Sequence, residues 1–191
     1  MRFALALSLL LLPGLAHAAP PPAKPSAPAP KEVVSEEKLF AQLKQAGSAE
    51  DAHPIEQKIL AMFRASGSPS VDLLLTRAQA AQAATDNKTA KKLFEAVTNI
   101  APKYAEGWHL RAAMEQADGD DTNALVSLQK VVLLNPRHFA AMTELADMLE
   151  EYGDKAGALK MYRRALALDP QLEAASRKVR ELTQSVEGRD I

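Results

Sequence analysis

Small and apolar residues recur along residues 71–172 with a period of 34. When this stretch is divided into the blocks 71–104, 105–138 and 139–172, positions 8 and 20 are alanine in every block. Position 4 carries Leu74, Trp108 and Met142, and position 24 carries Phe94, Leu128 and Tyr162. Two antiparallel helices pack closely where one of them offers a very small side chain. Each block is therefore predicted to be a pair of packed helices, in an all-α fold without strands.

Turn and stop signals agree with these helix pairs. Each block has a proline at position 32 (Pro102, Pro136 and Pro170), which ends a helix because it lacks a backbone N–H and restricts the preceding residue. The segments 118–121 and 152–154 contain glycine and aspartate, which favour turns between the two helices of a pair. The acids of 118–121 could also suggest a calcium loop. Because the closing glutamate of an EF-hand is missing, we predict capping aspartates instead.

Residues 35–70 and 173–187 are predicted to add helices at the two ends, so that 35–187 forms one solenoid. The first segment is predicted to form a degenerate helix pair with a long connection, Gly47–His53. Ser70 is the expected N-cap of the next helix. The second segment is predicted to form a C-terminal capping helix, and residues 188–191 are expected to fray. Its shared helical face consists of Leu172, Ala175, Val179, Leu182 and Val186.

The period and the matching columns resemble the tetratricopeptide repeat (TPR) family over residues 71–172. The resemblance implies a right-handed superhelix of helix pairs whose concave face binds peptides or partner proteins. Two positions depart from the family pattern. Position 7 carries Arg77 and Arg111 in the first two blocks, and position 11 carries Glu115 in the second. We expect the arginine stems to cover apolar neighbours while their charged groups stay in water.

In the family, positions 2, 5, 9 and 12 of each first helix line the concave groove. Here the candidate partner-binding residues are Asp72, Leu75, Gln79, Gln82, Glu106, His109, Ala113, Gln116, Thr143, Asp147 and Glu150. They include four acids and no Lys or Arg, so the lysine and asparagine clamp by which some relatives hold a free carboxylate is absent. One hypothesis is that the groove accepts a basic or neutral peptide, or a helix with an exposed cation. The alternative is that the acids only keep the surface soluble.

The N-terminus has the features of a secretory signal peptide. Arg2 precedes the apolar run Phe3–Leu12, and Ala16–Ala18 gives a small-x-small cleavage site, so residues 1–18 are predicted to be removed. An uncleaved anchor is the alternative. Residues 19–34 are rich in proline and alanine and are predicted to form an extended linker. We expect a periplasmic protein, or alternatively a secreted one, by resemblance to small exported bacterial TPR proteins.

Composition and histidine spacing limit the kinds of partner and chemistry that the chain is predicted to have. After removal of residues 1–18 the chain has a net charge of −2, which does not favour nucleic acid as a partner, and it has no cysteine. His53, His109 and His138 lie far apart in the sequence and form no metal-binding motif, so no metal, cofactor or catalytic site is predicted. Trp108, Met142 and Met148 are interpreted as core residues.

These observations favour a non-enzymatic adaptor or scaffold in the bacterial envelope, with another protein or a peptide as its partner. No stable membrane insertion is expected after signal cleavage, because the apolar run is too short to span a bilayer. Two alternatives remain open at this point. The chain could be a self-associating structural protein, or an accessory subunit of an envelope enzyme or maturation system.

Overall fold

The computed structural model describes residues 35–188, which lie in one compact unit and contain nine α-helices and no strand. The all-α prediction is confirmed. The predicted signal peptide, the predicted linker and residues 189–191 lie outside the described residues. The helices are α1 (Glu36–Gln45), α2 (Ala49–Phe63), α3 (Pro69–Ala83), α4 (Asn87–Ile100), α5 (Ala105–Ala117), α6 (Asp121–Leu134), α7 (Phe139–Glu151), α8 (Lys155–Leu168) and α9 (Glu173–Val186).

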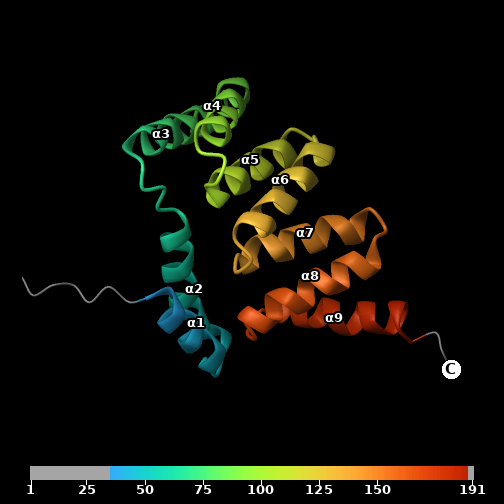
Figure 1. Ribbon diagram of the computed structural model, residues 1–191. Coiled ribbons are helices and arrows are strands. Elements are labelled where there is room, and N and C mark those ends of the chain that lie inside the picture. The colour runs from blue at the N-terminus through green and yellow to red at the C-terminus, as the bar shows by residue number, and fades with distance from the viewer. Residues whose placement is uncertain (1–34, 189–191) are drawn as a thin grey trace, which may run out of the picture. The chain divides into compact units, whose positions relative to one another are not determined.

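The three predicted helix pairs are α3–α4, α5–α6 and α7–α8, and α9 packs against α8 as the predicted capping helix (Figure 1). The small-residue columns lie at the helix contacts. All six alanines at positions 8 and 20 are completely buried: Ala78, Ala90, Ala112, Ala124, Ala146 and Ala158. The position-24 side chains fill the space between them and are buried in every repeat. Met142 and Met148 are core residues, as predicted. In the described part of the chain, no helix is both long and apolar enough to cross a membrane.

Two predicted helix boundaries are wrong. Helix α3 begins at Pro69 with Ser68 as its N-cap, so Ser70 lies inside the first turn. The fixed φ of proline suits the first helical position, and this preference decides where the helix starts. Helix α2 begins at Ala49, so the connection after α1 is far shorter than the predicted Gly47–His53. The Ser48 hydroxyl accepts the Asp51 N–H and caps this earlier start.

The prediction for Arg111 is also wrong, because its guanidinium does not remain in water. Its Nε donates to Glu115 at 2.7 Å, and Glu115 is only 1 % exposed. The Ser127 hydroxyl of α6 donates to the other Glu115 oxygen at 2.6 Å. The two unusual residues at positions 7 and 11 thus form one hydrogen-bonded ion pair within α5, and its buried carboxylate also bonds to α6. Arg77, in contrast, is exposed.

The N-terminal hairpin, which comprises α1, α2 and the turn between them, packs across the loops that precede the first helices of the repeats. After the end of α2, the Arg64 carbonyl accepts a hydrogen bond of 2.8 Å from the Tyr104 hydroxyl, just before α5. The Phe63 ring centroid lies 5.0 Å from that of His138, just before α7. The C-terminal end of α2 therefore touches the starts of two successive repeats.

The other end of the hairpin reaches the start of α9. The Gln171 side-chain amide donates to the Ala46 carbonyl at 2.7 Å. Between the two ends, the Phe40 ring packs edge-on against Phe139, and the Arg137 guanidinium lies 3.9 Å above it. The predicted N-terminal helix pair is present, and it spans the loops before α5, α7 and α9 instead of extending the stack of repeats.

Candidate functional site

Most of the predicted groove residues line pockets on the first-helix face. Two pockets of about 210 and 540 Å³ lie along α3 and α5 and share several wall residues, among them Arg64 and Glu106. Seven of the eleven predicted residues line one or both: Asp72, Leu75, Gln79, Glu106, His109, Ala113 and Gln116. Arg64 was missed, because the 34-residue register gave no reason to place the N-terminal hairpin beside α5.

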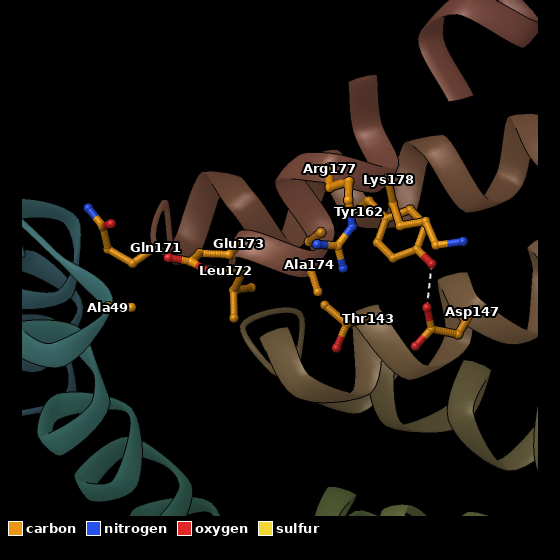
Figure 2. Close-up of a pocket in the computed structure, with 11 residues that line it drawn as sticks. Ala49, Thr143, Asp147, Tyr162, Gln171, Leu172, Glu173, Ala174, Arg177 and Lys178 are labelled. Atoms are coloured by element: carbon orange, nitrogen blue, oxygen red, sulfur yellow. Dashed lines mark hydrogen bonds between the residues drawn. The ribbon is translucent and has the colours of Figure 1, made fainter. Parts of the chain in front are cut away.

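A third pocket of about 400 Å³ is formed by α7, α8 and α9 (Figure 2). Thr143 and Asp147 are the predicted groove residues that line it. Helix α9 contributes Arg177 and Lys178, and Tyr162 comes from α8. The α9 residues were not predicted, since that helix lies outside the repeat columns. The prediction that this helix caps the last repeat could have indicated that its residues line the groove. The remaining predicted residues, Gln82 and Glu150, line none of these three pockets.

The acidic residues of the predicted groove form hydrogen bonds or ion pairs with other side chains of the same chain. Asp72 accepts a hydrogen bond from the Ser66 hydroxyl. The Tyr162 hydroxyl donates to Asp147, as Figure 2 shows. Glu150 is paired with Lys178 at 2.9 Å. The fourth acid, Glu106, is buried in the cluster described below. Each of these three acids therefore already has an internal partner, and Lys178 also balances the charge of Glu150.

Arg177 lines the third pocket and has no side-chain partner in the described part of the chain. Among the described residues it forms no ion pair and no side-chain hydrogen bond. The apolar residues Leu172, Ala174 and Ala175 share the pocket with it. The pocket thus combines an apolar wall with one free guanidinium, which can donate to a carbonyl or carboxylate oxygen.

A cluster of two histidines and two glutamates joins α5 to α7 beside the end of α2. His109 Nδ1 lies 3.4 Å from Glu106 Oε2, and His109 Nε2 lies 2.8 Å from Glu144 Oε2. Burial alone would lower the pKa of His109, but its bonds to Glu106 and Glu144 raise it to about 9. Burial likewise opposes ionisation of Glu106, yet the bonds from His109 and His138 lower its pKa to about 2. His109 is thus held as a cation between two carboxylates.

His138 completes the cluster and also caps a helix. Its Nδ1 accepts the Ala141 N–H at 3.2 Å, at the start of α7. The ring proton is therefore on Nε2, which donates to Glu106 Oε2 at 3.1 Å. Sequence spacing concealed this contact, because His109 and His138 are 29 residues apart. They occupy positions 5 and 34 of one block, and position 34 directly precedes the next first helix. That placement is the sequence signal from which the contact between the two histidines could have been predicted.

A second acidic contact joins the hairpin to the last repeat. The Asp169 side chain is fully buried after α8, and its Oδ2 has no hydrogen-bond donor when both acids are ionised. Burial and the hydrogen bond with Asp169 raise the pKa of Glu56, on α2. Burial also raises the pKa of Asp169. A proton on Glu56 can satisfy Oδ2, so this contact is strongest when the pair shares a proton.

Comparison with known proteins identifies the repeat. Residues 139–172 match the family model described as tetratricopeptide repeat. No curated protein matches the chain significantly. Solved structures with a similar fold include the Sgt2 TPR domain from Aspergillus fumigatus, which is 22% identical with a TM-score of 0.54 over 63% of this chain and 81% of that one.

Two further similar structures are complexes. The Yersinia enterocolitica type III secretion chaperone SycD, bound to a peptide of the translocator YopD, is 18% identical with a TM-score of 0.54, over 65% of this chain and 97% of that one. The TPR2B domain of yeast Sti1, in a complex with pHsp70, is 18% identical with a TM-score of 0.54, over 62% and 99%. At these identities the likeness establishes the fold. Residues 139–172 match a tetratricopeptide repeat, and the described part of the chain is similar in fold to TPR domains.

Proposed function

We propose that the protein is a non-enzymatic adaptor that binds a segment of another protein on its first-helix face. The observation that carries the proposal is the set of three pockets along α3, α5 and α7, which nine of the eleven predicted groove residues line. Pockets lined by apolar residues and a few polar groups suit the alternating side chains of a peptide. The SycD and Sti1 structures support the proposal, because each is a similar fold in complex with a peptide or protein ligand.

The chemistry of the face favours a neutral segment over a basic one. The acids Asp147 and Glu150 already accept bonds from Tyr162 and Lys178, so a cationic ligand would compete with those partners. Arg177 remains available beside an apolar wall. The ligand is therefore proposed to place an apolar side chain in the pocket beside α9 and to direct a carbonyl or carboxylate oxygen at Arg177.

Affinity capture from an envelope extract tests the adaptor function. Gln79 and Gln116 are exposed, line the pockets and form no side-chain hydrogen bond among the described residues. Gln79→Arg and Gln116→Arg should therefore block the face without removing an internal contact. Gln129→Arg, an exposed position on α6 outside these pockets, is the matched control. Loss of the captured protein with the first two variants alone supports the proposal. Equal capture by all three variants would refute it.

We also propose that the protein acts outside the cytoplasm of a bacterial cell, because residues 1–18 have the pattern of a cleaved signal peptide. Cell fractionation with intact-mass measurement tests this directly. The periplasmic fraction should contain a chain that begins at Ala19. An intact chain that still begins at Met1 in the cytoplasmic fraction would exclude export.

A further inference from the structure

We propose that Glu106, His109 and His138 form a binding site for a divalent transition-metal ion, with zinc as the best-matched metal. The three residues come from α5 and from the loop before α7. Each offers one ligand atom, and these atoms all lie within 4.8 Å of one another. Two imidazoles and a carboxylate are a ligand set that zinc accepts in proteins.

The spacing of the ligand atoms is close to that of a tetrahedral site. Zinc bonds to nitrogen and oxygen are ~2.0–2.1 Å long, so tetrahedral ligand atoms lie about 3.4 Å apart. Glu106 Oε2 lies 3.4 Å from His109 Nδ1 and 3.1 Å from His138 Nε2. The ligand nitrogens of the two imidazoles lie within 4.8 Å of each other, and their ring centroids are 4.6 Å apart.

The groups around the ligands also favour a metal. With a metal on Nδ1, the His109 Nε2–H would point at Glu144, whose carboxylate oxygens lie 3.0 and 2.8 Å away. A carboxylate behind a ligating histidine fixes the ring orientation and makes the ligand more basic. His109 and Glu106 also line the pocket of about 540 Å³ beside α5.

Metal binding has a specific structural consequence at His138. A metal on Nε2 leaves the neutral ring with its proton on Nδ1, which can then no longer accept the Ala141 N–H. The helix cap would be lost, which lowers the affinity about fivefold. A divalent ion held by three protein ligands outweighs this loss. The consequence is also measurable, because the Ala141 amide should lose protection from hydrogen exchange when metal binds.

Titration of the full chain with zinc chloride tests the proposal by calorimetry, after removal of bound metal with a chelator. We expect one saturable zinc site. Glu106→Gln and His138→Gln should weaken binding at least ~100-fold. Glu144→Gln, behind the ligands, should weaken it ~10–100-fold. His53→Gln is the control, because His53 is exposed on α2 and should leave the affinity unchanged.

A second measurement is independent of whether the ligand variants fold. Cobalt(II) added to the wild-type chain and to His53→Gln should give the intense visible absorption of tetrahedral coordination, and equimolar zinc should remove it. The proposal is overturned by octahedral cobalt spectra, by the absence of a saturable zinc site, or by equal zinc affinities of the wild type and folded Glu144→Gln.

Discussion

Thr85 occupies a backbone conformation that the other repeats reserve for glycine. It lies at position 15 of its block, in the turn between α3 and α4, and has a φ of 58°. Gly119 and Gly153 occupy position 15 in the next two blocks, with φ of 74° and 84°. The hydrogen bonds of the turns match as well. The Thr85 N–H donates to the Gln82 carbonyl at 2.9 Å, as the Gly119 N–H does to Gln116. Thr85→Gly should therefore stabilise the protein.

The magnitude follows from two opposing effects. A non-glycine residue in the left-handed region costs about 1–2 kcal/mol, and threonine lies toward the upper end because it is β-branched. Glycine loses more backbone entropy on folding, which offsets about 0.5–1 kcal/mol of that gain. The Thr85 hydroxyl bonds only to the adjacent Ala84 carbonyl at the surface, so its removal changes little. The net expectation is a stabilisation of about 0.5–1 kcal/mol.

Urea unfolding followed by circular dichroism measures this difference directly. The reverse substitution, Gly119→Thr, is the matched control and should destabilise the protein by a similar amount. A Cβ at Gly119 would meet no atom within 4 Å, so its effect reports the backbone alone. The reasoning fails if Thr85→Gly lowers the unfolding midpoint, or leaves it unchanged, while Gly119→Thr lowers it.

Three further substitutions test the packing and the hairpin contact. Glu56→Gln should stabilise the protein at neutral pH and flatten its pH dependence, since an amide N–H can satisfy Asp169 Oδ2 without a shared proton. In the wild type the pKa values of Glu56 and Asp169 are both raised in the folded state, so the stabilisation from their shared proton is present in acid and is lost as the pH rises through these values. Urea unfolding midpoints measured across that pH range report this loss. Ala124→Leu should destabilise the domain by about 1–3 kcal/mol in urea unfolding, because the alanine is completely buried in the core and a larger side chain overpacks it. Trp108→Ala should cost about 3 kcal/mol by the same assay, since the half-buried ring packs on the core and its Nε1 donates to the Pro102 carbonyl.

The repeat architecture was predictable because its cause is local and periodic. An alanine such as Ala112 is needed wherever a helix pair meets closely, and the same need recurs 34 residues later at Ala146. Each helix pair therefore leaves the same pattern in the sequence. The groove residues followed from that register, because positions on one face of a helix remain on one face in every repeat.

The hairpin contacts and the histidine cluster were not predictable in the same way. They depend on single side chains at the loops, such as Phe63 against His138, and no other block repeats them. Arg111 shows the same limit within a repeat. Its exposure was inferred from its residue type, whereas its position is set by Glu115, one helical turn further along the same face. Pairs that occur once leave no periodic signal.

Glu106 links the proposed binding face to the N-terminal hairpin. Its carboxylate lines both pockets beside α5, bonds to His109 and His138, and lies 3.8 Å from the Arg64 guanidinium after α2. A ligand that enters these pockets therefore contacts residues that hold the end of the hairpin in place. If the ligand strengthens the Arg64 contact, then docking of the hairpin must strengthen ligand binding by the same factor, because coupling between two binding equilibria is reciprocal. If it displaces Arg64, the two events must oppose each other to the same extent.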